Sequence, residues 1–594
     1  MGKATKQTVK FQKNRLKQTL ERRRKQQKQD ESINKLQDIV NKNTYFCNFT
    51  LDSEEDLDLE EDKDTDLDIL NELDAAPSID EDGNSLEIGF IDNDDMEDDE
   101  EEDDDMDEDS DAPLVTPDLL KEWKEQLKRR SPQAFRLLLL AFKAIAKDDD
   151  EPATYRVNNS KVYMDIITTT TTCAYPILSD HLILNKKVRH PSKTRFWTRL
   201  SPVVQLLLNN AVRILRDLDQ DDLLIHILTN LEPCSIYFGC FPKLANEYLR
   251  VLLDRWADLS LTSEARLVCY KAIRALGTQA VDATSKQNFL PHALKGVYLT
   301  FAKRATKINE QTMDGVQQMM EEAADLYAVD PKLSQPHAHV YLQQLADHLK
   351  TARKAKTVEN FKSIYTWQYV MCLDFWSNVI AVTCHPEQGQ TAMQELLPPV
   401  IDLSLVTMRL NPTAQFLPLR IHVLRSLIAL IDSTGFFVPL APYLFEVFEN
   451  DIFRSNVQHD PTLAPFLWEC HLKAPKQYVN TKVYQSAVYQ VTHDMILDYY
   501  ACFGMSIAYP ELAVPAINKL KEQRERFGGS RFLKSLKQLI EKMETHKNYI
   551  EQKRTPIEYT PTAMDEASSF LRNTAFESTP LGNYLKKREA ASSS

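Results

Sequence analysis

Residues 365–376 read YTWQYVMCLDFW, and this stretch decides the fold class. At about 3.6 residues per turn of an α-helix, the side chains in and beside it fall into two apolar stripes. The stripes are Ile364, Trp367, Met371 and Phe375, and Tyr365, Tyr369, Cys372 and Trp376. A helix that is apolar on two sides packs between two layers of other helices. We therefore predict an all-α, layered protein, and we interpret Asp374 as a buried structural acid that needs a hydrogen-bond or charge partner, not as a catalyst.

Helical segments continue in both directions from this stretch. Between Tyr155 and about Arg526, apolar residues recur at helical spacing, and prolines or short polar turns separate the segments. The predicted helices cover residues 160–184, 202–217, 220–231, 242–258, 263–276, 290–308, 312–328, 336–352, 358–384, 389–410, 415–433, 438–449, 480–504 and 511–526. Consecutive pairs advance by about 40 residues, as in HEAT-like hairpins. The pattern predicts a HEAT/armadillo-like α-solenoid. The run Thr168–Thr172 makes a weak helix with a potential interruption.

Glycine usage supports a helical fold, since only 13 of 594 residues are glycine and few positions can adopt a positive φ. Before the solenoid, Thr116 and Pro117 mark a helix start, and a second amphipathic helix is predicted from about Pro132 to Ala146. The chain then divides into five segments. They are a basic disordered arm (1–50), an acidic disordered segment (51–112), an N-terminal helical pair (113–154), the solenoid body (155–550) and an extended C-terminal tail (551–594).

Charge is sorted along the chain. Residues 1–28 hold eleven Lys or Arg against Glu21, and residues 51–111 hold thirty-three Asp or Glu against Lys63. Such densities keep a segment from packing a core, so both are expected to be disordered when free. Subtracting residues 1–111 from the net charge of −16 leaves +7 for the remainder. The folded part is mildly basic.

Signals for catalysis or metal binding are weak. The nine cysteines contain no CxxC pair, and the sequence contains no GxGxxG, GxxxxGK, GxSxG or HExxH motif. His337 and His339 lie two positions apart, which directs them to different faces of a helix. The least charged stretch, residues 363–386, contains Asp374 and is better explained as a buried helix than as a membrane span. We expect no catalytic residues, no cofactor, no metal, no membrane association and no small-molecule substrate.

Clustered cations are better evidence, because phosphate binding requires only positive charge on a rigid support. Arg22, Arg23, Arg24 and Lys25 have the density of a nuclear-import signal or a nucleic-acid arm. Three further clusters are candidate RNA contacts. They are Lys186, Lys187, Arg189, Lys193 and Arg195, ending at the aromatic pair Phe196 and Trp197; Lys350, Arg353 and Lys354; and Lys519, Lys521, Arg524 and Arg526. Gly528 and Gly529 are expected to split the last region into two helices.

Three sequence blocks, in order, carry a family resemblance. YTWQYVMCLDFW at 365–376, LPLRIHVLRSL at 417–427 and AYPELAVPAINKLK at 508–521 resemble the nucleolar complex protein two family of ribosome-assembly factors. YPILSDHLILNKKVRHP at 175–191 and APKQYVNTKVYQ at 474–485 add support. The resemblance extends over most of residues 115–550. The residues taken to form the structural family motif are Trp367, Tyr369, Asp374, Phe375, Trp376, Pro510 and Glu511.

The resemblance implies a noncatalytic scaffold for precursors of the large ribosomal subunit, acting in the nucleolus and nucleoplasm. It also implies heterodimers with other nucleolar complex proteins and contacts to pre-ribosomal RNA. Two alternatives remain open at this point: a nuclear transport adaptor of the HEAT type, and an acidic chaperone for histones or other basic proteins. Binding to a nuclear GTPase in its GTP form would favour the adaptor, and complete dependence of function on residues 51–111 would favour the chaperone.

Overall fold

The computed structural model describes residues 113–146, 155–182, 190–218, 220–280, 288–354, 361, 363–386, 389, 391–411, 413–453, 463–526, 532–555 and 570–592. Within these ranges the regular structure is helical, and the only β-type pairing is an isolated bridge between Leu114 and Arg156. The all-α prediction is confirmed. The basic arm and the acidic segment lie outside the described residues, so their predicted disorder stays a prediction.

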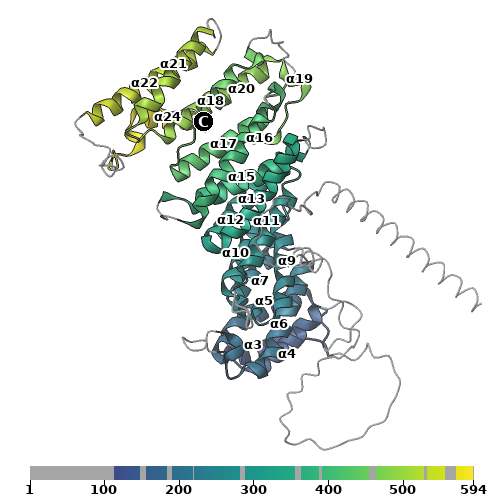
Figure 1. The fold of residues 1–594 in the computed structure, drawn as a ribbon. Helices are drawn as coiled ribbons and strands as arrows, with labels where there is room; N and C mark the ends of the chain where they lie inside the picture. The colour runs from purple at the N-terminus through teal and green to yellow at the C-terminus, as the bar shows by residue number, and fades with distance from the viewer. Residues whose placement is uncertain are drawn as a thin grey trace, which may run out of the picture.

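The long helices form two parallel layers. One layer contains α5 (Ser160–His181), α7 (Asp221–Leu231), α10 (Ser263–Gln279), α12 (Met313–Ala328), α15 (Trp367–Thr383), α17 (Leu417–Thr434) and α20 (Lys482–Cys502). The other contains α4 (Pro132–Ile145), α6 (Trp197–Asp217), α9 (Pro242–Ala257), α11 (Leu290–Arg304), α13 (Pro331–Lys354) and α16 (Leu397–Arg409). Each helix contacts the next one in its own layer. The two layers build the elongated stack seen in Figure 1, as expected of a solenoid.

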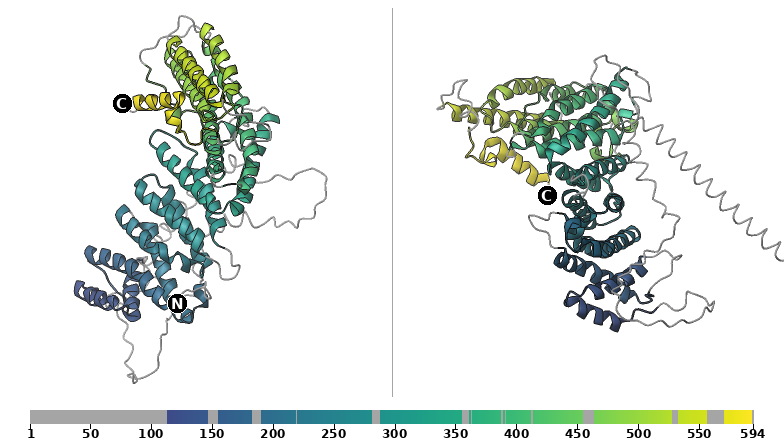
Figure 2. Two further views of the ribbon diagram at one scale, coloured as in Figure 1. Left: turned by 90° about the vertical axis from the view of Figure 1, so that its left-hand side faces the viewer. Right: turned by 60° about the horizontal axis from the view of Figure 1, so that its bottom comes forward.

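Shorter and terminal helices complete the stack. They are α3 (Pro117–Lys128), α8 (Ser235–Phe238), α18 (Ala441–Phe448), α19 (Lys476–Val479), α21 (Tyr509–Arg526), α22 (Leu533–Arg554) and α24 (Pro580–Ser592). Helix α3 packs on α4 and α5 at one end, and α21, α22 and α24 pack together at the other. Figure 2 shows α24, in yellow, lying across the direction of the neighbouring helices.

Polar caps explain where many helices begin. The Thr116 hydroxyl accepts a hydrogen bond from the Leu119 amide at 3.3 Å, as predicted from the sequence. Ser131, Thr262, Thr366 and Thr481 cap α4, α10, α15 and α20 in the same way. We had predicted that this helix begins at residue 358. Because Thr366 is the cap, α15 begins instead at Trp367.

Two predicted helix starts were too late because they were placed at or beside a proline. Helix α6 begins at Trp197 and contains Pro202, and α13 begins at Pro331 and contains Pro336. In α13 the first turn is anchored by the buried Ser334 hydroxyl, which donates to the Tyr327 carbonyl at 2.8 Å. Tertiary contacts of this kind outweigh the hydrogen bond that an internal proline removes.

The threonine run does not interrupt α5. The hydroxyls of Thr168, Thr170, Thr171 and Thr172 each donate to the carbonyl four residues earlier, at 2.7–2.9 Å. Thr170 and Thr171 are fully buried. Burial against the neighbouring helices therefore stabilises a segment whose intrinsic helix propensity is low.

The prediction of an extended C-terminal tail is wrong for residues 570–592. After Phe576–Ser578, a short 3-10 turn, the chain forms α24 and packs on α22. The Thr579 hydroxyl accepts from the Gly582 amide at 3.1 Å, and Leu581 is fully buried. A polar cap and the buried Leu581 contribute to holding this short helix on the body.

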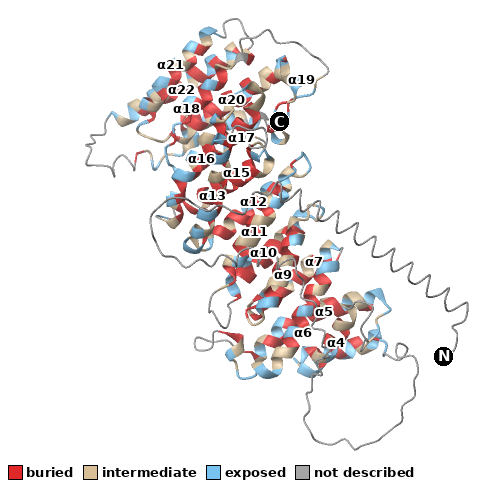
Figure 3. Ribbon diagram, turned by 45° about the vertical axis from the view of Figure 1, so that its right-hand side comes forward, coloured by how far each residue is buried: buried red, intermediate tan, exposed pale blue. Residues whose placement is uncertain are grey.

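One connected set of buried apolar side chains runs through both layers. Figure 3 shows the buried positions, in red, continuing along the stack while exposed positions face outward. Among the described residues, one stretch is long and apolar enough to span a membrane by length and composition, Ala414–Thr434, and 61% of its apolar window is buried inside the protein. It contains α17, which packs against α15, α16 and α20 as a core helix.

Candidate functional site

The predicted core helix α15 lies where four helices meet. Phe375 and Trp376 are fully buried. Their rings contact Tyr298 and Phe301 of α11, Tyr327 of α12 and Tyr341 of α13, with centroids 4.9–6.1 Å apart. The Tyr369 hydroxyl donates to the Leu345 carbonyl of α13 at 3.4 Å. These motif residues join the two layers, so their role is structural.

Asp374 lies on α15, toward α17. Burial raises the pKa of its carboxyl, and the Ser426 hydroxyl of α17 acts in the opposite direction. Asp374 retains intermediate exposure, so the expectation of a buried acid was too strong. Ser426 Oγ lies near this carboxyl but forms no hydrogen bond among the described residues, so the predicted hydrogen-bond partner of Asp374 stays a prediction.

The block LPLRIHVLRSL positions α17 against its neighbours. Arg420 is buried, and its guanidinium donates to the carboxylate of Glu446 on α18 at 2.8 Å. The His422 ring bonds the Trp468 carbonyl at 2.8 Å and contacts the Trp367 ring edge-on, with centroids 5.1 Å apart. Burial lowers the pKa of His422. The polar members of this block thus connect α15, α17 and α18 with the segment around Trp468.

The block APKQYVNTKVYQ contacts the residues just before α17. The Ala474 amide donates to the Gln415 carbonyl at 2.8 Å, and the Gln415 side chain donates back to the Ala474 carbonyl at 3.1 Å. The Tyr484 hydroxyl donates to the Ala414 carbonyl at 3.0 Å. The start of α17 and the start of α20 are therefore held together by backbone-directed hydrogen bonds.

The block AYPELAVPAINKLK seats α21 on α22. Tyr509 and Pro510 are buried, and the Tyr509 ring contacts the His546 ring edge-on at 4.6 Å. Glu511 is exposed and accepts two hydrogen bonds from Arg554, at 2.8 and 3.0 Å. Pro510 and Glu511, which we predicted as motif residues, thus belong to an intramolecular joint at the C-terminal end.

The first predicted cation cluster is described only in part, because Lys186, Lys187 and Arg189 lie outside the described residues, as does the Arg22–Lys25 arm. Lys193 and Arg195 are exposed just before α6. The Arg195 guanidinium lies over the Phe196 ring, 5.6 Å from its centroid, and Phe196 is 47% exposed. A cation beside an exposed ring is a suitable arrangement for phosphate and base contacts.

The second and third clusters differ in how many of their cations form ion pairs with carboxylates of other helices. Lys350 pairs with Asp347 within α13, and no ion pair involves Arg353 or Lys354 in the part of the chain that is described. By contrast, Lys519 pairs with Glu449 at 3.0 Å and Lys521 with Glu544 at 2.6 Å. These two lysines tie α21 to the end of α18 and to α22, which leaves them less available to an external phosphate.

The three clusters are not gathered into one patch. They lie on α6 and the turn before it, on α13 and on α21, at separate levels of the stack in Figure 1. A ligand that touches all three must be long and must follow the solenoid. An extended nucleic acid has these properties.

The α13 surface also carries a feature that we had not predicted. Leu333 and Val340, on the same helix as Lys350 and Lys354, are 39% and 52% exposed. A helical wheel of residues 331–354 would have shown these positions on one side. The sequence alone would predict that these apolar side chains are buried in the core, and only the positions of the neighbouring helices show that they are exposed.

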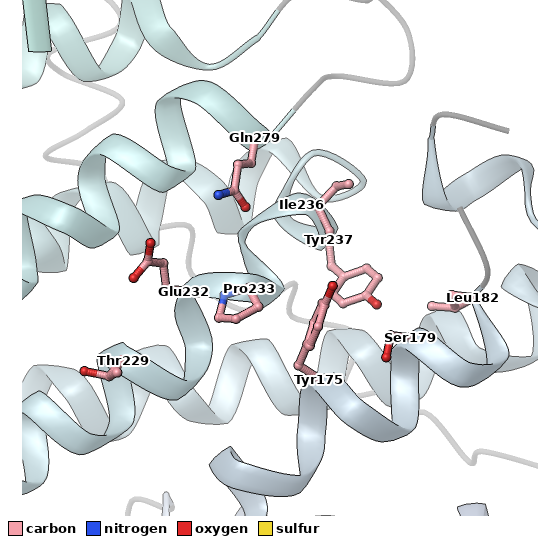
Figure 4. Close-up of a pocket in the computed structure, with 9 residues that line it drawn as sticks. All are labelled: Tyr175, Ser179, Leu182, Thr229, Glu232, Pro233, Ile236, Tyr237 and Gln279. Atoms are coloured by element: carbon pink, nitrogen blue, oxygen red, sulfur yellow. The ribbon is translucent and has the colours of Figure 1, made fainter. Parts of the chain in front are cut away.

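An open concavity of about 620 Å³ lies between α5, α7, α8 and α10 (Figure 4). Tyr175 of α5 and Tyr237 of α8 lie side by side on its wall, and Thr229, Glu232 and Gln279 add polar groups. Burial raises the pKa of Tyr237, and Tyr175 contributes in the same direction. Among the described residues that line this concavity, Glu232 is the only charged side chain, so the lining offers no acid–base pair. Across the described ranges, no group of three His, Cys, Asp or Glu converges as metal ligands.

Comparison with known proteins shows several relatives. An uncharacterised NOC2 family protein of Schizosaccharomyces pombe is 26% identical over 515 residues, covering 85% of this chain and 72% of the relative. Nucleolar complex protein 2 of Drosophila melanogaster is 26% identical over 455 residues, covering 74% of this chain and 58% of the relative. Nucleolar complex-associated protein 2 of Arabidopsis thaliana is 24% identical and covers 77% of this chain and 60% of the relative. The chain thus spans less than two thirds of the fly and plant proteins.

The Noc2p family model matches residues 288–588. This range is more than half of the chain, and it runs from the start of α11 into α24. It contains the α15 core helix, the α17 block and the α21–α22 joint. The chain belongs to the Noc2p family.

Proposed function

We propose that this protein is a noncatalytic scaffold for assembly of the large ribosomal subunit, acting in the nucleolus and nucleoplasm. The observation that carries the proposal is its membership of the Noc2p family, whose fly and plant relatives are named as nucleolar complex proteins. A two-layered solenoid supports it, because such folds offer long surfaces for partners and carry little internal machinery. The proposed partners are other nucleolar complex proteins, bound as heterodimers, and pre-ribosomal RNA.

The RNA contact is proposed for the exposed cations of two clusters, Lys193 with Arg195 and Lys350 with Arg353 and Lys354. These side chains are exposed on ordered helices or turns. Lys519 and Lys521 contribute less in this proposal, since both pair with carboxylates of neighbouring helices. Arg524 and Arg526 remain candidates at the end of α21.

The function is tested by affinity purification from nuclear extract, with identification of the copurifying RNA and proteins. We expect large-subunit precursors and at least one other nucleolar complex protein. Depletion of the protein should reduce mature large subunits. Unchanged precursor processing after depletion would contradict the proposal, and recovery of a nuclear GTPase in its GTP form would favour a transport adaptor instead.

The RNA contact is tested separately with charge reversals in the full chain. The triple variant Lys350→Glu, Arg353→Glu, Lys354→Glu should weaken binding to a large-subunit rRNA fragment and lower the salt dependence of binding by about one unit per lost phosphate contact. The matched control is Lys243→Glu with Lys271→Glu, two exposed lysines of α9 and α10. Equal loss per reversed charge in variant and control would show nonspecific attraction and reject the assigned surface.

A further inference from the structure

The concavity between α5, α7, α8 and α10 lies at the C-terminal ends of three helices. Helix α5 ends at His181, α7 at Leu231 and α10 at Gln279. The lining residues Ser179, Thr229 and Gln279 belong to the last turns of these helices. The C-terminal end of a helix carries a partial negative charge that acts within its last turn. Three such ends at one concavity favour a positively charged ligand.

The chain does little to compensate these negative ends. A Lys, Arg or His in the last turn usually stabilises a helix, but α7 and α10 have none there. The last turn of α5 contains His181, whose Nε2 is buried without a hydrogen-bond partner among the described residues. Glu232 is the C-cap residue of α7, so a full negative charge is added where the helix already disfavours one. A bound cation would offset this cost.

The Glu232 carboxylate is available to a ligand. No ion pair involves it in the part of the chain that the structure describes, and no Lys or Arg is among the described lining residues. Asp180, which follows Ser179 in the chain, is already paired with Arg130. None of the described groups that act on the pKa of Tyr237 is a cation. The concavity therefore attracts a cation and disfavours phosphate.

Two tyrosines add an aromatic face and a hydrogen-bonding group (Figure 4). Tyr237 lines the concavity and is only 1% exposed, yet its hydroxyl forms no hydrogen bond with the described residues. A buried hydroxyl without a partner carries a desolvation cost that a ligand can remove. Tyr175 is 39% exposed and offers a ring on which a planar cation can stack.

An arginine side chain matches these groups better than a lysine does. Its guanidinium is planar, stacks on aromatic rings and has five N–H donors, which suit carboxylate, hydroxyl and carbonyl oxygens. The concavity of about 620 Å³ is within the range of roughly 300–1,000 Å³ that encloses drug-sized ligands. It therefore has room for more than one side chain of a peptide.

We propose that this concavity binds an arginine-containing basic segment of a partner protein. A guanidinium stacks on Tyr175, the positive charge of the segment pairs with Glu232 and the three helix ends, and a donor of the segment bonds the Tyr237 hydroxyl. The site lies outside residues 288–588, so the family model does not imply it. It does not depend on the proposed RNA contacts either, because a basic peptide and RNA have opposite charge.

Cations of the same chain are the alternative occupants. Lys186, Lys187 and Arg189 follow α5 in the sequence but lie outside the described residues. The basic arm, residues 1–28, precedes an acidic segment whose thirty-three carboxylates compete for it more strongly than one glutamate does. A partner protein is therefore the occupant that we assign, and the experiment must separate it from both.

Photo-crosslinking of the full chain tests the site. The probe is the peptide Gly-Arg-Gly-Arg-Gly-Arg-Gly with a diazirine at one end, and mass spectrometry maps where it couples. We expect crosslinks within residues 175–182 and 229–237 and at Gln279, in addition to nonspecific ones on residues 51–111. Titration of the peptide gives a dissociation constant for the concavity alone. The same peptide with lysine in place of arginine should bind about threefold more weakly, because an ammonium does not stack as a planar group.

Variants of the lining separate specific from nonspecific attraction. Glu232→Gln should weaken binding at the concavity about fivefold to tenfold, and Tyr175→Ala about threefold to fivefold. Tyr175→Phe keeps the ring and should bind nearly as the unmodified protein does. The matched control is Glu264→Gln, which removes an exposed carboxylate at the opposite end of α10 and should change nothing. Glu232→Gln is nearly isosteric, and circular dichroism checks the fold of Tyr175→Ala.

Several results would overturn the assignment. Crosslinks confined to residues 51–111, or equal losses in Glu232→Gln and Glu264→Gln, would reject the site. Equal affinity for the lysine peptide would reject the guanidinium. Tighter peptide binding after deletion of residues 1–28, or in the triple variant Lys186→Gln, Lys187→Gln, Arg189→Gln, would assign the concavity to the chain's own cations. Ultraviolet crosslinking of a large-subunit rRNA fragment to Tyr175 would assign it to RNA.

Discussion

The centre of the solenoid and its C-terminal end are held together by different forces. Around α15, six aromatic rings from four helices contact one another in edge-to-face, tilted and stacked arrangements, and Phe375 and Trp376 are fully buried. At the C-terminal end, α24 is held by Arg588, which donates to Asp494 at 3.0 Å and to Asp498 at 2.9 Å on α20. The centre depends on a large buried apolar area, whereas α24 depends on a small apolar contact around Leu581 and on a few directional contacts.

The difference predicts how each region fails. Buried apolar contacts are numerous and nondirectional. Removing a buried side chain should therefore lower the free energy of unfolding of the whole stack by a large amount. The contacts of α24 are few, so losing one of them should loosen the helix without unfolding the body. The family model covers both regions, since it runs from residue 288 to residue 588.

The largest effect is expected from Trp376→Ala. Removing a fully buried indole between α11, α12, α13 and α15 should lower the free energy of unfolding by about 3–5 kcal/mol. Urea denaturation followed by circular dichroism measures it. The control is Phe437→Ala, whose side chain is 55% exposed and should cost far less. Equal losses for the two variants would show that the centre is not the principal source of stability.

Gly582→Ala should have a moderate and local effect. A Cβ at Gly582 would overlap the carbonyl of Phe576, and the backbone cannot move aside as a flexible side chain can. We expect α24 to detach, at a cost of about 1–3 kcal/mol, with faster amide hydrogen exchange in residues 570–592 only. Asn583→Ala, at the exposed neighbouring position, is the control. Unchanged exchange in Gly582→Ala would mean that the close approach is relieved without undocking.

Arg588→Gln should weaken the same attachment less. The Arg588, Asp494 and Asp498 side chains are 28%, 31% and 43% exposed, so solvent screens both pairs. A loss of about 0.5–1 kcal/mol is expected, and it should shrink as salt is added. A double-mutant cycle with Asp498→Asn isolates the pair. A coupling energy that does not change with salt would indicate packing by the arginine stem instead of charge.

The smallest effect is a pH dependence centred on His546. Burial lowers the pKa of this ring below its ordinary value of 6.5, and the hydrogen bond of Nε2 to the Gly504 carbonyl at 2.8 Å opposes this only in part. His546 Nδ1 is buried without a partner, so a second proton there would not be satisfied. The unfolded chain therefore takes up protons more readily as pH falls through 6.5, and stability should decrease between pH 7 and pH 5.

The pH effect is measured by hydrogen exchange in α22 and in residues 570–592, because the Phe576 ring lies against Gly504. His546→Gln keeps a donor for the Gly504 carbonyl and cannot titrate. It should show a smaller decrease than the unmodified protein over the same pH range. An identical pH profile in both would assign the dependence to other groups, such as His422, whose pKa burial also lowers.

The same comparison explains which expectations were met. The α15 helix was predictable because its aromatic pattern has a single physical solution, burial on two sides, and the Thr116 cap was predictable because its hydrogen bond is local. The early starts of α6 and α13, and the uninterrupted α5, depend on contacts made by residues far away in sequence. For α24, the local sequence is polar and short, so only its docking on α22 reveals the helix.

The candidate surfaces follow the same rule. Clustered cations are visible in the sequence, and the structure describes Lys193, Arg195, Lys350, Arg353 and Lys354 as exposed. It also shows that Lys519 and Lys521 pair with carboxylates of α18 and α22, 70 and 23 residues away in the chain. Such pairs cannot be read from the charge pattern, since they depend on which helices become neighbours.

By itself, the amino-acid sequence determined the helical class, the aromatic core helix and the separation of basic, acidic and folded segments. These properties follow from side-chain periodicity and charge density, which act over a few residues. Only the tertiary structure decided which charges are paired, which aliphatic side chains stay exposed on α13 and where the C-terminal helix docks. These depend on the stacking of two layers, because burial and ion pairing are properties of neighbours in space and not of neighbours in sequence.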